Sequence, residues 1–180
     1  MNRLALLWDE SQIWGLLVHR ALAAWGFPTE IIRGRDIPEG RLKKNPPAAL
    51  IAPGGFASRK YASLGTRGAA AVRDYVASGG SYLGFCGGAG LALSGETGLA
   101  LCPWRRETFS DRLRHLVSGH VRLSVPPEAA ADPFAPGPPE LPAPVWWPGQ
   151  FEAAATDQPR VLARYAEPAE DFFMADLQLS

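Results

Sequence analysis

Short apolar runs alternate with longer amphipathic segments along the first half of the chain. Residues 3–8 form a near-continuous apolar run of strand length, typical of a strand buried on both faces of a parallel sheet. Three more runs predict strands, at 29–32, 48–52 and 81–85. Apolar residues at three- and four-residue spacing predict helices over 13–25, with Ser11 as a candidate cap, and over 64–77. This alternation predicts an α/β protein with a mostly parallel sheet.

The second half of the chain carries weaker patterns. Alternating residues predict a strand at 121–125, and a further apolar run predicts one at 161–165. The segment 126–148 holds nine of the seventeen prolines, which excludes a regular helix or a central strand and favours a long surface loop. Because 180 residues suit one domain, the sequence predicts a single domain over 1–180 with a proline-rich excursion at 126–148.

Charge and cysteine content limit the kinds of molecule that this protein is expected to bind and the compartment in which it is expected to work. Eighteen basic residues balance eighteen acidic ones, so no overall field draws the protein to nucleic acid or to anionic lipid. We therefore expect a small-molecule substrate or ligand, or a protein partner such as a second copy in a homodimer. Two cysteines, without the spacing of a zinc site, indicate a reducing compartment, and we expect no metal or other cofactor. Asp9 and Glu10 end the first apolar run well short of a signal peptide, and no stretch is long enough to span a membrane, so we expect a soluble, cytoplasmic protein.

The strongest chemical signal is Cys86, which directly follows the predicted strand 81–85. Gly84, Gly87 and Gly88 surround it, and a nucleophile on a sharp strand-to-helix turn tolerates only such small neighbours. A helix that begins after Cys86 would direct its backbone N–H groups and the positive end of its dipole at the sulfur, which favours the reactive thiolate. The sequence therefore predicts a nucleophile elbow at Cys86.

A second glycine pair lies at the end of another predicted strand. Acyl transfer needs hydrogen-bond donors for an oxyanion, and the natural candidates are Gly87 together with the pair Gly54-Gly55, while Gly88 completes the expected binding turn. Both motifs follow parallel strands, at the edge where ligands bind in open α/β sheets. The alternative is that Gly84 and Gly88 only allow a helix to pack closely on the sheet, with Cys86 as a small buried apolar residue.

The segment 50–94 resembles class I glutamine amidotransferase-like domains and, within them, the N-terminal domain of some biotin–protein ligases. The resemblance rests on Ile51-Ala52-Pro53-Gly54-Gly55, on Gly79-Gly80-Ser81-Tyr82-Leu83-Gly84 and on Cys86-Gly87-Gly88-Ala89. That family typically has alanine where Gly87 stands. The resemblance implies a flavodoxin-like three-layer sandwich, a mostly parallel sheet with helices on both faces, and Cys86 in the position of the family's nucleophile. It does not imply ligase activity by this chain, because nothing resembles the biotinyl-adenylate loop of a ligase.

Glutamine amidotransferases complete their site with a histidine two residues from a glutamate near the C-terminus, and this sequence lacks that pair. Its histidines are His19, His115 and His120, and His120, just before a predicted strand, is the best candidate base, although a structural or solvent-facing role is the commoner explanation for all three. Glu10 follows the first strand and is a candidate for tuning Cys86, although an acid at a helix start is the commoner explanation. Two explanations fit the missing pair: the chain stops before the family's final strand, or the domain has lost its hydrolytic site.

Three hypotheses for function follow. In the first, the protein is an amidotransferase-like hydrolase in which Cys86 attacks an amide or related acyl carbon. In the second, it is a non-catalytic module that keeps the pocket to bind a metabolite or to regulate a partner. In the third, Cys86 is a redox-sensing thiol; Cys102 is a candidate to resolve its oxidised form, although a packing role is the commoner explanation for Cys102. The sequence leaves open whether the protein is an enzyme.

Overall fold

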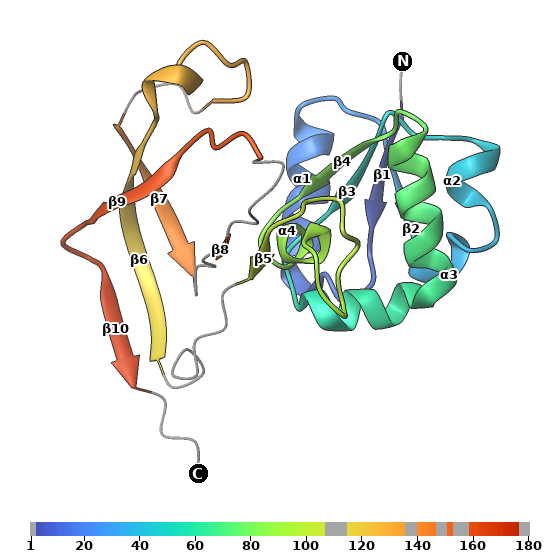
Figure 1. Ribbon diagram of the computed structural model, residues 1–180, viewed down its shortest axis with the longest axis horizontal. Helices are drawn as coiled ribbons and strands as arrows, with labels where there is room; N and C mark the ends of the chain where they lie inside the picture. Colours follow the sequence, from blue (N-terminus) through green and yellow to red (C-terminus); the bar gives the residue numbers. More distant parts are fainter. Residues whose placement is uncertain (1–2, 107–114, 136–139, 147–150, 153–158, 177–180) are drawn as a thin grey trace. The chain divides into compact units, whose positions relative to one another are not determined.

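The computed structural model describes residues 3–106, 115–135, 140–146, 151–152 and 159–176 (Figure 1). The chain divides into two compact units. The first consists of residues 1–106 and 151–157, and the second of residues 107–150 and 158–180. The expectation of a single domain over 1–180 stays a prediction.

The first unit contains a four-stranded parallel sheet, which confirms the four strands predicted for the first half of the chain. In the strand order β2-β1-β3-β4, the strands are β1 (Leu4–Leu7), β2 (Thr29–Ile32), β3 (Ala49–Ala52) and β4 (Ser81–Gly84). Leu7 pairs with Ile32, and Ala52 pairs with Gly84, so the strands end at the same edge. The loops that follow them therefore share this carboxyl-terminal edge.

Helices cover both faces of this sheet (Figure 1). They are α1 (Gln12–Ala24), α2 (Arg41–Lys44), α3 (Ala57–Ala77) and α4 (Gly87–Ala92), together with a 3-10 turn, η1 (Gly34–Asp36). The step from β1 to β2 runs in one direction along the sheet and the step from β3 to β4 in the other, so right-handed connections place α1 and α3 on opposite faces. This confirms the three-layer α/β fold. Among the described residues, no helix is both long and apolar enough to cross a lipid bilayer.

The helix α3 begins at Ala57 rather than at the predicted Leu64. Gly65 interrupts it with φ 62° and ψ 177°, a conformation outside the helical region that glycine adopts readily. The part of α3 before Gly65 is helical, but polar residues interrupt its apolar positions, so apolar periodicity did not reveal it. Its residues Lys60 and Leu64 are nevertheless both buried, one helical turn apart.

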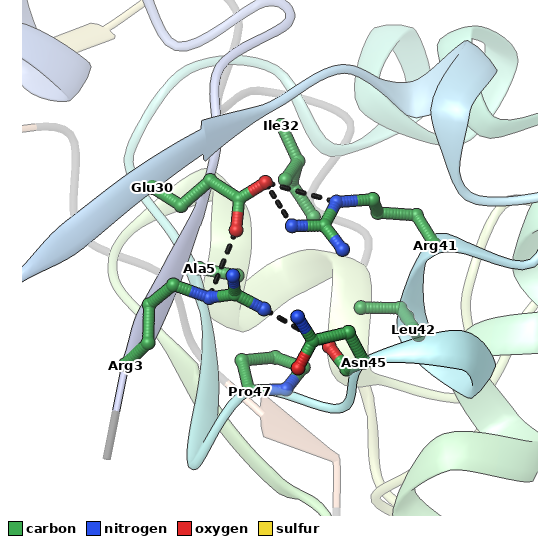
Figure 2. A pocket seen from close by; sticks show the side chains of 8 residues that line it. All are labelled: Arg3, Ala5, Glu30, Ile32, Arg41, Leu42, Asn45 and Pro47. Atoms are coloured by element: carbon green, nitrogen blue, oxygen red, sulfur yellow. Dashed lines mark hydrogen bonds and ion pairs between the residues drawn. The ribbon is translucent and has the colours of Figure 1, made fainter. Parts of the chain in front are cut away.

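At the amino-terminal edge of the sheet, Glu30 of β2 connects two other elements (Figure 2). Its carboxylate lies 2.9 Å from Nε of Arg3, just before β1, and accepts a 2.9 Å hydrogen bond from Nε of Arg41 in α2. A guanidinium nitrogen of Arg3 also donates to the carbonyl oxygen of Asn45 at 3.1 Å. These side chains fill the space between them and leave no room for a ligand. This edge is therefore a structural brace.

The second unit contains an antiparallel sheet around one long strand. The strand β6 (His115–Ser124) pairs with β7 (Glu140–Trp146) on one side, and with β9 (Arg164–Pro168) and β10 (Phe173–Asp176) on the other. A 3-10 turn, η2 (Pro127–Ala129), follows β6. The predicted strand 121–125 corresponds to the end of β6, and the predicted strand 161–165 begins three residues before the observed β9 and overlaps its start. In the first unit, the short β5 (Arg105–Arg106) pairs with β8 (Phe151–Glu152).

The strand β7 lies where the sequence predicts a loop over 126–148. Its prolines, Pro142 and Pro144, stand opposite Arg122 and His120 of β6. They are two residues apart, so the two ring nitrogens face the same side of the strand. Among the described strands β7 is at an end of its sheet, where a proline nitrogen directed away from the neighbouring strand removes no ladder hydrogen bond. The proline content therefore excluded a central strand but not this one.

Candidate active site at a cysteine elbow

Cys86 stands between β4 and α4, at the carboxyl-terminal edge of the parallel sheet. The N–H of Phe85 donates to the carbonyl oxygen of Ala52 at 3.0 Å, which extends the strand pairing up to the turn. Cys86 then has φ 51° and ψ −114°, a conformation that is strained for any residue except glycine. The N–H of Gly90 donates to the Cys86 carbonyl oxygen at 3.0 Å and begins the helix. This strained strand-to-helix turn leaves Cys86 exposed, so the alternative of a small buried residue is wrong.

The backbone around Cys86 packs so closely that Gly84 and Gly88 must be glycine. A Cβ atom on Gly84 would lie 2.6 Å from the carbonyl carbon of Gly88, and one on Gly88 would lie 1.8 Å from the carbonyl oxygen of Ala52. Both distances are far below van der Waals contact, so neither position has space for a side chain. These glycines allow α4 to pack against β3 and β4, and they also form the turn that presents Cys86.

The hydroxyl of Tyr82 fixes the first turn of α4. Tyr82 lies on β4, and its OH donates to the carbonyl oxygen of Gly88 at 2.7 Å. Burial raises the pKa of Tyr82 well above its ordinary value, because the phenolate would lose its solvation. The donor therefore stays protonated at neutral pH and connects the strand before the elbow to the helix after it.

The glycine loop after β3 meets the elbow. A Cβ atom on Gly87 would lie 1.7 Å from the carbonyl oxygen of Gly55, so the two backbones are in direct contact. Gly55 has φ 115°, and a Cβ there would lie 2.0 Å from the carbonyl oxygen of Glu10. A Cβ on Gly54 would in turn lie 2.8 Å from the indole of Trp14. The structure thus brings together the loops that carry Glu10, Gly54, Gly55 and the Cys86 turn, as the strand order predicts.

Glu10 lies on this edge with a positive φ of 54°. Its carboxylate is 4.0 Å from a guanidinium nitrogen of Arg59 at the start of α3. The guanidinium of Arg59 also stacks over the ring of Phe56, 5.2 Å from its centroid. A role for Glu10 in tuning Cys86 stays a prediction. Ser11 occupies the N-cap position of α1, but its hydroxyl makes no capping hydrogen bond.

His120 belongs to the second unit, on β6. Its backbone N–H donates to one carboxylate oxygen of Asp171 at 3.0 Å, and its Nδ1 lies 2.6 Å from the other. These hydrogen bonds from His120 lower the pKa of Asp171. Sequence reasoning missed Asp171, because 51 residues separate the two partners and no local pattern pairs them.

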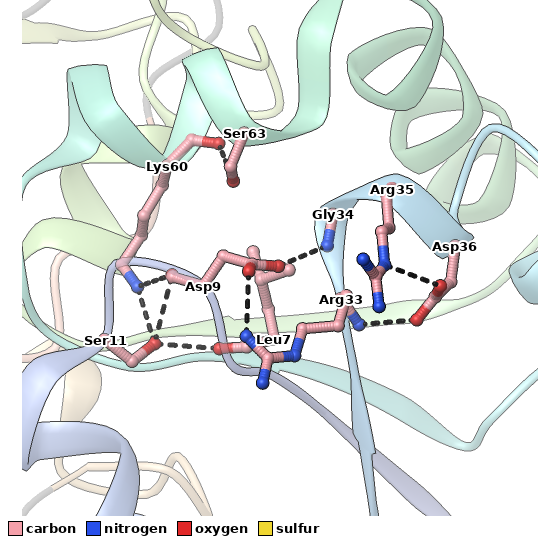
Figure 3. Close-up of polar contacts among 9 residues, drawn as sticks. All are labelled: Leu7, Asp9, Ser11, Arg33, Gly34, Arg35, Asp36, Lys60 and Ser63. Atoms are coloured by element: carbon pink, nitrogen blue, oxygen red, sulfur yellow. Dashed lines mark hydrogen bonds and ion pairs between the residues drawn. The ribbon is translucent and has the colours of Figure 1, made fainter.

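Lys60 is a buried charged residue beside the elbow that sequence reasoning also missed (Figure 3). Its side chain has no exposed surface, and Nζ donates to Oγ of Ser11 at 2.7 Å and to the carbonyl oxygen of Asp9 at 3.1 Å. The Ser11 hydroxyl, which accepts from Lys60, itself donates to the carbonyl oxygen of Leu7 at 2.8 Å. Burial lowers the pKa of Lys60 to about 8, and the negative charges of Glu10, Asp9 and Cys86 oppose that shift.

A polar cavity of about 280 Å³ opens next to this lysine (Figure 3). Its lining consists of Asp9, Arg33, Arg35 and Ser63. The Asp9 carboxylate accepts hydrogen bonds from the N–H of Gly34 at 2.5 Å and from Arg33 at 3.3 Å. Asp9 and Arg33 follow the ends of β1 and β2, so the cavity and the elbow lie on the same edge of the sheet.

The fold of this chain is similar to that of solved structures of the glutamine amidotransferase kind. A solved structure of a glutamine amidotransferase aligns with a TM-score of 0.61 at 21% identity, covering 89% of this chain and 79% of that chain. A Thermoplasma acidophilum protein, described as a putative component of GMP synthase, aligns with a TM-score of 0.57 at 17% identity, covering 96% of this chain and 78% of its own.

Within that fold, residues 40–95 match the family model described as the N-terminal part of biotin–protein ligase. The matched segment contains the glycine loop, the helix α3 and the whole Cys86 elbow. The resemblance predicted from residues 50–94 is therefore confirmed. None of the curated proteins compared with this chain matches it.

Proposed function

We propose that this protein is a glutamine amidotransferase-like domain in which Cys86 is the nucleophile for hydrolysis or transfer at an amide or related acyl carbon. The observation that carries the proposal is the exposed Cys86 in a strained turn, within a segment that resembles glutamine amidotransferase-like domains, whose nucleophile the resemblance places at this position. Strained backbone conformations cluster at active sites, where the surrounding structure holds them in place. The close packing of Gly84, Gly87 and Gly88 provides that support.

The proposed chemistry has two steps. The Cys86 thiolate attacks the carbonyl carbon, a C–S bond forms, and the tetrahedral intermediate collapses with cleavage of the C–N bond while the leaving nitrogen takes a proton. Water then attacks the thioester, releasing a carboxylic acid and returning the thiol. Backbone N–H groups of Gly87 and of the Gly54-Gly55 loop are the candidate donors to the oxyanion.

The base remains a separate proposal. His120 is the candidate from the sequence, and Asp171 orients its ring in the way that a third group orients the base of a triad. Replacing His120 with alanine tests this role. Loss of turnover at unchanged Cys86 alkylation would support a base in the acyl-transfer step, whereas full activity would exclude it.

The experiment that tests the main proposal compares Cys86 with Cys102 in the same protein. Alkylation by iodoacetamide, followed by mass spectrometry of the two peptides, gives each rate, and ammonia release from glutamine or simple amides gives turnover. We expect Cys86 to react at least about tenfold faster than Cys102 at pH 7, because a free thiol is only a few per cent thiolate there. Equal rates, together with no turnover that depends on Cys86, would refute the proposal.

A non-catalytic binding module is the second candidate, and the polar cavity favours it. About 280 Å³ lined by Asp9, Arg33, Arg35 and Ser63 is room for a small polar metabolite. If binding is the function, a ligand found by thermal-shift screening should stabilise Cys86→Ala as strongly as the unmodified protein. Substitution at Arg35 should abolish that stabilisation.

A further inference from the structure

Neither hydrogen bond of the buried Lys60 ammonium goes to a carboxylate, so a direct ion pair does not neutralise its charge. Lysine is rarely buried without a paired carboxylate, yet both of its hydrogen bonds go to neutral oxygens, the Ser11 hydroxyl and the Asp9 carbonyl. The two acids on the same loop have other partners: the Asp9 carboxylate binds Arg33, and Glu10 faces Arg59. The ammonium of Lys60 is therefore a local positive charge in a site shielded from water.

Lys60 is connected to the cysteine turn through the glycine loop that lies between them. Its Cε would be 3.5 Å from a Cβ atom on Gly55, so the lysine stem packs directly against the glycine loop. The carbonyl of Gly55 is in turn in contact with Gly87, the residue after Cys86. On its other side Lys60 holds Asp9 and Ser11, which flank the strained residue Glu10. One side chain thus joins the loop after β1 to the loop after β3, and that loop supports the elbow.

We propose that Lys60 is a positioning residue of this site, which holds the Asp9–Ser11 loop and the Gly54-Gly55 loop together and thereby sets the reactivity of Cys86. This inference rests on the proposed function, in which Cys86 is the nucleophile. The ionisable groups whose charges act on the Lys60 ammonium are Asp9 and Glu10 from the loop after β1, and Cys86 from the turn after β4.

The charges around Lys60 connect it to the cysteine turn. The negative charge of Cys86 favours the protonated form of Lys60. Buried surroundings strengthen such an interaction, because the effective dielectric constant is lower there than in water.

The decisive measurement is the pH profile of Cys86 alkylation in Lys60→Met. Methionine fits a buried site without charge, and Arg59→Met is the matched control, since Arg59 is the neighbouring cation on the same helix and is largely exposed. At pH 6.5 we expect the Cys86 alkylation rate to fall at least about tenfold in Lys60→Met, because the two loops that support the Cys86 turn lose the side chain that joins them. The Cys102 rate should not change, and Arg59→Met should stay within about twofold of the unmodified protein. A Lys60→Met profile that superimposes on that of the unmodified protein would overturn the inference, even if the variant is less stable.

A second measurement does not depend on the folding of Lys60→Met. In protein with ¹³C-labelled lysine, the Lys60 titration is followed by NMR with and without the substitution Cys86→Ala. Removing the thiolate should lower the pKa of Lys60, and an unchanged pKa would contradict the inference. The two proposals fail in different ways. Slow alkylation of Cys86 in the unmodified protein refutes the nucleophile, whereas fast alkylation that is insensitive to Lys60 refutes only the role of the lysine.

Discussion

Gly87 and Gly55 are in such close contact that a Cβ atom on Gly87 would lie 1.7 Å from the Gly55 carbonyl oxygen. The contact joins two loops that are distant in sequence and that both follow parallel strands. The related family typically carries alanine at this position, so this chain departs from the pattern at the point where its glycine loop meets the elbow. Glycine here allows the loop to lie closer to Cys86 than a side chain would permit.

Gly87→Ala should therefore destabilise the protein by about 1–3 kcal/mol, since backbone rather than a flexible side chain must move. The matched control is Gly90→Ala in the same helix, where the new Cβ would lie 3.4 Å from Cβ of Ala57, an ordinary contact. That variant should be neutral or up to about 1 kcal/mol more stable, as expected for alanine in a helix. Urea unfolding measures both. Equal stability of the two variants would contradict the close contact.

Cys86→Gly should be more stable than Cys86→Ala. A positive φ strains alanine as it strains cysteine, by about 1–3 kcal/mol, and glycine avoids that strain. The greater freedom of glycine in the unfolded chain offsets about 0.5–1 kcal/mol, so we expect a net difference of about 1 kcal/mol. Chemical denaturation of the two variants checks the order. If Cys86→Ala is the more stable, the turn is not strained in solution.

Lys60 should make stability rise with pH between about 8 and 10.5. A lysine in the unfolded chain keeps its proton up to about pH 10.5, whereas folded Lys60 has a pKa of about 8. In this window the unfolded state binds more protons, so the free energy of unfolding increases with pH. From pH 7.5 to 9.5 the increase from this group is about 2 kcal/mol. Lys60→Met should lose the increase while Arg59→Met keeps it, and an unchanged slope in Lys60→Met would show that Lys60 titrates normally.

Tyr82→Phe should loosen the elbow. The variant loses the hydrogen bond to the Gly88 carbonyl, at a cost of about 1 kcal/mol. The matched control is Tyr75→Phe, because the Tyr75 hydroxyl donates to Pro47 at 2.9 Å, before the start of β3 and therefore at the opposite edge of the sheet. Both variants should lose similar stability, but only Tyr82→Phe should change the alkylation rate of Cys86.

Tyr82 also predicts a loss of stability in alkali. Because burial raises its pKa in the folded state, its contribution is complete below the ordinary tyrosine pKa of 10.0 and is lost as the pH rises above that value. Tyr82→Phe should weaken this decline, which unfolding curves measured at pH 9 and pH 11 would reveal. An equally steep decline in the variant would assign the effect to other groups.

The sequence predicted the elements whose signals are local. Each strand of the parallel sheet contains a short apolar stretch, and the glycines around Cys86 predict a turn with no space for side chains, so the elbow and its contact with Gly54-Gly55 followed from strand order. Lys60 was missed because the polar first turns of α3 and the break at Gly65 hide its position one helical turn before Leu64. Tertiary packing, and not propensity, buries that lysine.

Contacts between residues that are far apart in the sequence could not be predicted for the same reason, because tertiary packing decides them. The contact of His120 with Asp171 depends on the register of the second sheet, which the alternating pattern at 121–125 does not specify. Sequence reasoning missed the strand β7, because a high proline content favours a loop over a strand. The spacing of Pro142 and Pro144 by two residues was the signal that could have revealed an outer strand.

Those two prolines have a consequence for how the protein behaves in concentrated solution. An outer strand normally offers a row of unpaired N–H groups on which a strand of another molecule can assemble. Pro142 and Pro144 have no N–H to offer on the outer side of β7, and both are exposed. The second sheet therefore protects one of its own borders against intermolecular strand addition, the first step toward aggregation.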